Sequence, residues 1–235
     1  MQQKDFISKQ MKNKSYIGIS LIILIFGILI VPKIVERVKK GDVVKGDRLN
    51  LQTNHVKSDL VKIGPAPDFS LTDQNKKTIT NDSYKGKVYV LEFFFSTCPT
   101  ICPKMNANLK EVQQQFKGLK DFGIASITIN PENDTAEVLK KHAADLDIND
   151  ENWHFLTGDK DYIYTVANKG FNMYAAQNSK VNGGFEHSGL FALIDKDGNI
   201  RCRKDDFGNP ILYYDGLEKK GIQALIEDIK LLLNE

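Results

Sequence analysis

The feature that most constrains the fold is the apolar run at residues 88–95, VYVLEFFF, in which Glu92 is the single charged side chain. A run of β-branched and aromatic residues without polar alternation is typical of a strand that is buried on both faces of a sheet. Residues 122–129 (FGIASITI) and 189–195 (GLFALID) follow the same pattern. We therefore expect a central strand, flanked by similar strands, in a sheet that helices cover.

Helical and turn signals alternate with these strands. Helical periodicity and capping residues predict helices over residues 103–118, 134–143, 162–170 and 217–232. A short strand is predicted at residues 153–157, and polar turns predict hairpins within residues 68–80 and 189–202. This alternation, with one late hairpin, predicts a three-layer α/β domain with a mixed sheet.

The N-terminal part of the chain has a different character. Residues 1–15 form a lysine-bearing tail, and residues 16–31 carry no charge. With Ile34 and Val35 the apolar stretch extends over residues 16–35, close to the ~17–25 residues that span a bilayer. No small-residue cleavage pattern and no lipid-accepting cysteine follows, so we favour one uncleaved transmembrane anchor over a cleaved signal peptide. Residues 36–60 then read as a polar linker, and residues 61–235 as the folded domain.

The orientation of this single-pass anchor does not follow from charge. Lysines and arginines lie on both sides of the apolar stretch, so the positive-inside rule does not decide between the two orientations. We place the domain on the extracytoplasmic (periplasmic) side of the cytoplasmic membrane, because of the chemistry that its cysteines indicate.

Composition excludes some classes of protein. The 32 basic and 30 acidic residues give a formal net charge of only +2, and the lysines are scattered among acids, so we expect no nucleic-acid partner. The chain has three cysteines, which are too few for a disulfide-stapled scaffold or a four-cysteine zinc site. We therefore interpret the cysteines as functional residues, for thiol chemistry or metal binding, rather than as structural crosslinks.

Two of these cysteines, Cys98 and Cys102, come directly after the central strand, and each is followed by a proline. Pro99 or Pro103 can occupy the first turn of the next helix. A thiol at a helix N-terminus lies at the positive end of the helix dipole, which favours the thiolate. Both thiol exchange and metal binding need that thiolate, so the position alone leaves both functions open.

Spacing and a third residue favour metal binding. Three residues separate Cys98 from Cys102, whereas the thioredoxin-type redox motif has two, and His187 stands ahead of a later strand where such enzymes carry a proline. Two thiolates and one imidazole suit Cu(I) better than zinc, since structural zinc takes a fourth protein ligand. The alternative for His187 is a structural histidine that caps a turn or packs at the sheet edge, and this alternative stays open here.

The remaining titratable candidates receive structural interpretations. Glu92 could exchange protons with a nearby thiol if buried, but we favour a position near a strand end, partly solvated or paired with a lysine. Cys202 lies between two arginines, and we expect a buried apolar role for it rather than a reactive thiol. We expect the other three histidines to be solvated or structural: His55, His142 and His154.

Several motifs, in order, resemble the Sco/SenC family of thioredoxin-fold copper-binding proteins, which are implicated in assembling the copper centre of cytochrome c oxidase. The resemblance covers roughly residue 61 to the C-terminus. It is carried by TCPTICPKM at 97–105, ITINPENDTAEVLKKHAADL at 127–146, WHFLTGD at 153–159 and FEHSGLFALIDKDG at 185–198.

The resemblance implies a thioredoxin-like fold, with Cys98, Cys102 and His187 as copper ligands and an oxidase subunit with a copper site as partner. Three departures from the family pattern do not remove a ligand: Thr100 between the cysteines, the run of residues 93–95 (FFF), and Glu186 before the histidine. We expect Thr100 and Phe94 to change the surroundings of the metal. Residues 201–214 look like an elongated hairpin to which we assign no role.

Three functions remain as hypotheses. The first is a membrane-anchored chaperone that delivers copper, as Cu(I), Cu(II) or both, to an oxidase. The second is a dedicated thiol-disulfide oxidoreductase that uses Cys98 and Cys102 to reduce the metal-binding cysteines of an oxidase subunit. A peroxidase of the same fold is disfavoured, because no arginine or threonine stands at a spacing that would match a peroxidatic thiol. We thus expect a metal-delivery protein rather than an enzyme.

Overall fold

A computed structural model describes residues 18–29, 31–33 and 60–235. The chain divides into two compact units, Met1–Asn54 and His55–Glu235. In the first unit residues 18–29 and 31–33 are helical. Within the parts of the chain that are described, no helix combines the length and the apolar character needed to cross a bilayer. The predicted tail 1–15, parts of the predicted anchor 16–35, nearly all of the linker 36–60, and His55 lie outside the described residues.

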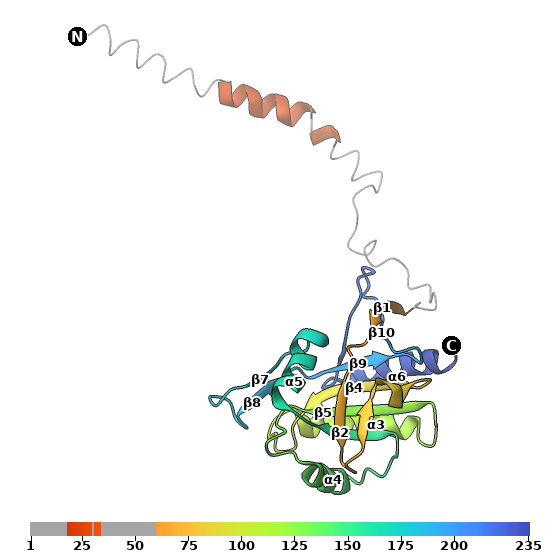
Figure 1. Cartoon of the computed structure of the whole chain (residues 1–235). Helices are drawn as coiled ribbons and strands as arrows, with labels where there is room; N and C mark the ends of the chain where they lie inside the picture. The colour runs from red at the N-terminus through yellow and green to blue at the C-terminus, as the bar shows by residue number, and fades with distance from the viewer. Residues whose placement is uncertain (1–17, 30, 34–59) are drawn as a thin grey trace, which may run out of the picture. The chain divides into compact units, whose positions relative to one another are not determined.

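The second unit is built on a mixed sheet (Figure 1). Strand β4 (Val88–Phe94) pairs in parallel with β5 (Phe122–Thr128), and β5 in parallel with β6 (Trp153–Thr157). On its other side β4 pairs antiparallel with β9 (Leu190–Ile194). Every residue of β4 and β5 is buried, as the unbroken apolar runs predicted.

Shorter strands complete the sheet in the order β1-β10-β9-β4-β5-β6-β2-β3. The predicted hairpins are β2 (Ser70–Asp73) with β3 (Thr78–Thr80), and β9 with β10 (Asn199–Cys202). Strand β1 (Val61–Pro65) pairs with β10 at one edge, and β11 (Tyr214–Asp215) pairs with β9. The short 3-10 helix η1 (Asn81–Tyr84) follows β3.

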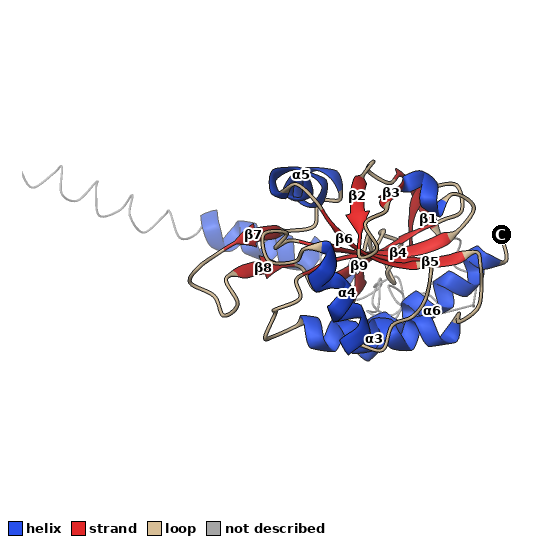
Figure 2. Ribbon diagram, turned by 60° about the horizontal axis from the view of Figure 1, so that its bottom comes forward, coloured by secondary structure: helices blue, strands red, loops and turns tan. Residues whose placement is uncertain are grey.

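Helices cover both faces of this sheet (Figure 2). On one face lie α3 (Cys102–Gln115), α4 (Ala136–Asp145) and α6 (Lys219–Leu233), and on the other lies α5 (Lys160–Thr165). The parallel strands β4, β5 and β6 are neighbours in that order, so the connections through α3 and α4 both move the same way across the sheet. Because such connections are right-handed, both helices lie on the same face. The predicted three-layer α/β arrangement is confirmed.

The predicted caps start two of the helices. The Thr135 side chain accepts a hydrogen bond from the Val138 N–H at 3.4 Å, and that of Asp159 accepts one from the Tyr162 N–H at 2.8 Å. Such caps satisfy backbone donors that have no partner within the first helical turn.

Three local predictions were wrong or incomplete. The helix expected over residues 162–170 is α5 followed by one π-helical turn, Val166–Gly170. The antiparallel ribbon of β7 (Ala175–Gln177) with β8 (Phe185–His187) was not predicted from the sequence. The segment 201–214 is a hairpin in part only, because its second strand β11 pairs with β9 rather than with β10, and a single bridge joins Lys204 to Pro210.

Candidate metal centre

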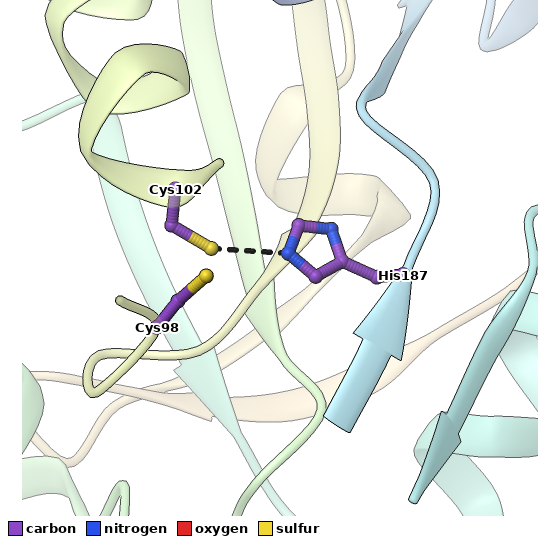
Figure 3. Close-up of side chains that lie close together, drawn as sticks. All are labelled: Cys98, Cys102 and His187. Carbon is purple, nitrogen blue, oxygen red and sulfur yellow. Dashed lines mark hydrogen bonds between the residues drawn. The ribbon is translucent and has the colours of Figure 1, made fainter. Parts of the chain in front are cut away.

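Three side chains that the sequence singled out converge at the end of β4 (Figure 3). Cys98 lies in the turn after β4, Cys102 is the first residue of α3, and His187 is the last residue of β8. The Sγ atom of Cys102 is 3.0 Å from Nε2 of His187, and the potential ligand atoms of the three residues lie within 4.8 Å of one another. In the part of the chain that the structure describes, this is the only such group of three potential ligands.

A buried carboxylate holds the turn that carries Cys98. Asp134 is fully buried and accepts hydrogen bonds from the backbone N–H of Ser96 at 2.9 Å, from the Ser96 hydroxyl, and from the Thr128 hydroxyl at 2.5 Å. It thereby links the turn after β4 to the end of β5. The sequence placed Asp134 only at the start of a predicted helix, and its role at the turn was missed because that role depends on contacts between distant residues.

The imidazole of His187 is oriented through its other nitrogen. Nδ1 lies 3.1 Å from the carbonyl oxygen of Ser188, so Nδ1 carries the proton and donates it. Nε2 is then left with its lone pair directed at Cys102. A histidine whose second nitrogen donates to a carbonyl is the usual arrangement at a metal site.

Aromatic packing fixes the ribbon on which His187 stands. The ring of Phe95 contacts the His187 ring edge to face, with 5.8 Å between the ring centroids. The ring of Phe95 also packs against that of Phe185, with 5.3 Å between the centroids. Gly183, at φ 90°, approaches the cysteine turn so closely that an added Cβ would lie 2.8 Å from Cδ of Pro99. A residue with a side chain would therefore push the ribbon, and His187 with it, away from the thiols.

The two thiols differ in their protonation. Burial raises the pKa of Cys98, but the neighbouring His187, the Thr100 hydroxyl and backbone N–H groups together outweigh burial and lower this pKa to about 5. Burial and the neighbouring Cys98 raise the pKa of Cys102. Without metal the pair therefore holds one thiolate and one thiol at neutral pH, and a metal ion that binds both sulfurs displaces the remaining proton.

Glu92 contradicts our expectation. It lies in the interior of β4, fully buried, and none of the lysines that the structure describes pairs with it. Its Oε1 accepts a hydrogen bond from the Ser126 hydroxyl at 2.7 Å, while Oε2 has no partner. Burial raises the pKa of Glu92 to about 7, against the lowering effect of Ser126. The prediction failed because the register of β4 with β5 sets Glu92 opposite Ser126 in the sheet centre.

A cavity of about 220 Å³ opens beside the cluster, and Cys98 and His187 contribute to its lining. Cys102, which is 2% exposed against 8% for Cys98, does not line it. A molecule that approaches through this cavity therefore meets Cys98 and His187 before it reaches Cys102.

The other predicted candidates lie apart from the cluster. His142 stacks on Phe94, Nδ1 of His154 is 3.3 Å from Oδ2 of Asp73, and Cys202 is fully buried, so these three have the structural roles that we expected. Thr100 does lie beside the candidate ligands, with its hydroxyl 3.5 Å from Sγ of Cys98. Phe94 instead packs against His142 and Phe155, and the ring beside His187 belongs to Phe95.

The fold and the cluster together define a thioredoxin-like α/β domain with a Cys-Cys-His group at the end of its central strand. The family model described as SCO1/SenC matches residues 62–219, and the chain belongs to this family. The expected family and fold are thus confirmed.

Individual relatives agree with this assignment. The SCO1 protein homolog of Bacillus subtilis (strain 168) is 33% identical over 166 residues, which are 69% of this chain and 79% of that protein. The solved structure of BsSco, described as a member of the Sco family of cytochrome c oxidase assembly proteins, is 28% identical with a TM-score of 0.60 and covers 75% of this chain and 97% of its own. Bradyrhizobium japonicum ScoI, solved with copper bound, is 26% identical with a TM-score of 0.57, over 72% of this chain and 99% of its own.

Proposed function

We propose that this protein is a membrane-anchored copper chaperone that binds copper through Cys98, Cys102 and His187 and delivers it to the copper centre of a cytochrome c oxidase. The observation that carries the proposal is the convergence of the two sulfurs with a nitrogen that comes from 85 residues further along the chain. The description of BsSco as a member of a family of oxidase assembly proteins, and the copper bound to Bradyrhizobium japonicum ScoI, support the same metal and the same class of partner.

The donor atoms suit copper. Thiolates are soft ligands that favour Cu(I), and imidazole binds both Cu(I) and Cu(II). A group of three ligands lacks the fourth protein donor of structural zinc sites. The carbonyl of Ser188 keeps the proton of His187 on Nδ1, so that Nε2 can bind a metal without first losing a proton.

The exposure of the ligands suits delivery. Cys98 borders the cavity while Cys102 lies behind it, so the ligands of an acceptor protein can reach the metal at the Cys98 side. Transfer then proceeds by stepwise exchange of thiolates, and Cys102 and His187 retain the metal until the acceptor has bound it.

Residues 16–35, in which Lys33 is the single charged residue, serve as the membrane anchor in this proposal, with residues 36–60 as a linker to the domain at residues 61–235. The absence of charge from residues 16–31 supports the anchor. The domain then lies on the extracytoplasmic side of the cytoplasmic membrane, where a copper centre of the oxidase would be assembled.

Anaerobic titration of the reduced protein with Cu(I) tests the metal site. We expect one copper per chain in the wild type, and a loss of affinity in Cys98→Ser, Cys102→Ser and His187→Ala. The matched control is Cys202→Ser, whose thiol is buried away from the cluster and whose removal should leave affinity unchanged. One copper bound with unchanged affinity in His187→Ala would contradict the three-ligand site.

One observation favours a second function, the dedicated thiol-disulfide oxidoreductase. The pKa of Cys98 is lowered to about 5 beside the free thiol of Cys102, as in a nucleophile with its resolving partner. In that reaction the Cys98 thiolate attacks a disulfide of the oxidase subunit, releases one thiolate of the subunit and forms a mixed disulfide with the other. Cys102 then loses its proton and attacks the Cys98 sulfur, which expels the second thiolate and leaves a Cys98-Cys102 disulfide and two reduced thiols on the partner. Incubating the reduced protein with the oxidised subunit and finding no exchange would rule this function out.

A further inference from the structure

An unexplained projection leaves the sheet between β10 and β11, and we call residues 203–213 the arm (Figure 1). All residues from 206 to 212 are exposed. The arm carries three large apolar side chains, Phe207 in its turn and Ile211 and Leu212 on its returning limb, with exposed fractions of 67%, 44% and 45%. Ile63 on the adjoining strand β1 is also exposed. Clustered apolar exposure of this kind marks an interaction surface.

The arm is held rigidly at its root. Asp228 of α6 is buried, and its carboxylate receives hydrogen bonds from Nε of Arg203 at 2.8 Å and from the Tyr214 hydroxyl at 2.7 Å. Arg203 also donates to the carbonyl of Ala224 at 3.0 Å. Both ends of the arm are thus fastened to α6, and the apolar tip is presented in a defined position.

The N–H groups of residues 207–211 need no partner outside the arm. The N–H groups of Phe207 and Asn209 donate to the Asp205 side chain, that of Gly208 to the Asp205 carbonyl, and that of Ile211 to the carbonyl of Arg203. Pro210 has no N–H to satisfy. Residues 207–211 therefore offer no free N–H donor to a strand of another protein. Because these donors are already paired within the arm, moving them into an apolar phase costs little free energy of desolvation.

The point at which the N-terminal segment enters the domain indicates that the apolar phase is the membrane. The Leu60 carbonyl accepts a hydrogen bond from Arg201 at 3.3 Å, and Val61 pairs with Cys202, the residue directly before the arm. The N-terminal segment therefore joins the domain at the root of the arm. The 25 linker residues 36–60 could extend to about 80 Å, so a linker alone would not keep the domain at the membrane.

We infer that the arm rests on the lipid surface, with Phe207, Ile211 and Leu212 inserted at the boundary between headgroups and acyl chains. This inference rests on the proposed membrane anchoring, and it adds a second contact that orients the domain. Strands β10 and β9 separate the edge strand β1 from β4, so the cluster at the end of β4 remains accessible to a partner protein while the arm touches lipid.

A fluorescence experiment tests the arm without the native anchor. The experiment uses residues 55–235, which form one compact unit. A similar length of this chain covers nearly the whole of the solved chain of Bradyrhizobium japonicum ScoI. The fragment carries an N-terminal histidine tag, and a nickel-chelating lipid holds it on phosphatidylcholine vesicles. The single tryptophan of the chain, Trp153, is buried. Phe207→Trp adds a reporter at the tip, and Leu119→Trp, at an exposed apolar residue between α3 and β5, is the matched control.

We expect brominated acyl chains to quench the added emission of Phe207→Trp several-fold more than that of Leu119→Trp. Adding Ile211→Ser and Leu212→Ser should return the quenching to the control value, while a cooperative urea-unfolding transition, followed by the emission of the buried Trp153, reports that the domain is still folded. Equal quenching of the two reporters in folded protein would overturn the inference and leave the copper site untouched. Release of the full-length chain from membranes by alkaline carbonate would instead contradict the proposed anchor.

Discussion

Two regions of this protein each bury a cysteine beside a strand end together with a carboxylate, and they differ in how completely their polar groups are paired. At the end of β4, Cys98 and Cys102 lie near Glu92, whose Oε2 has no hydrogen-bond partner. At the end of β10, Cys202 lies near Asp228, whose two oxygens are bound by Arg203 and Tyr214.

The pKa values of the thiols follow the same division. Hydrogen bonds lower the pKa of Cys98 to about 5 despite burial, while burial and Asp228 raise that of Cys202. Burial of a thiol therefore does not identify a reactive site here. The two regions differ in whether polar groups beside the thiol can still bind something else. Such groups are present beside Cys98, whereas the carboxylate beside Cys202 is fully paired with Arg203 and Tyr214.

The largest effect is expected from breaking the fully paired region. Arg203→Ala leaves the Asp228 carboxylate buried without its cation, and we expect the free energy of unfolding to fall by about 3–5 kcal/mol. Urea denaturation measures this change. Lys141→Ala is the control, since the exposed pair with Asp145 contributes only about 0.3–0.5 kcal/mol. Copper stoichiometry should stay at one, and a drop below one in the folded variant would show that the two regions are not independent.

The next effect comes from the incompletely paired carboxylate. Glu92 has a pKa of about 7 in the folded protein, raised from 4.5. Its neutral form therefore stabilises the fold below about pH 4.5, and that contribution is lost as the pH rises to about 7. Relative to the wild type, Glu92→Gln should gain stability across this window, by up to about 3 kcal/mol at pH 8.

Urea denaturation of the wild type and Glu92→Gln at pH 4, 6 and 8 provides the measurement. Comparing the two proteins at each pH cancels the titration of the groups that they share. A difference that does not change with pH would mean that the pKa of Glu92 is the same in the folded and the unfolded protein, which contradicts this prediction.

The smallest effect concerns the hydrogen bond between Thr100 and Cys98. Thr100→Val removes the hydroxyl that lies 3.5 Å from Sγ, and we expect the pKa of Cys98 to rise by up to about one unit. The pH dependence of iodoacetamide alkylation at Cys98, followed by mass spectrometry, measures that pKa. Thr97→Val, one residue before the cysteine and exposed, serves as the control and should leave the profile unchanged.

Much of this comparison was accessible from the sequence, because it depends on local patterns. The unbroken run at residues 88–95 predicted a strand buried on both faces, and the two thiols that follow it predicted a functional turn. The structural role of Cys202 was predicted as well. His187 was selected because the sequence places it ahead of a strand, and the structure brings it to Cys102.

The missed features all depend on pairing between distant residues. Strands β7 and β8 have three residues each and lie in a polar, glycine-containing stretch, so no periodicity reveals them. The environment of Glu92 depends on its register against Ser126, and the role of Asp134 depends on Ser96, 38 residues earlier. Local composition cannot report which polar groups will face each other across a sheet.

The central claim is that two sulfurs and one nitrogen from this chain hold the copper. X-ray absorption at the copper edge of the Cu(I)-loaded protein measures the ligands directly. We predict two sulfur scatterers from Cys98 and Cys102 and one imidazole nitrogen, with the nitrogen contribution lost in His187→Ala and the whole spectrum unchanged in Cys202→Ser. A spectrum with sulfur ligands alone, or a nitrogen contribution that persists in His187→Ala, would contradict the account.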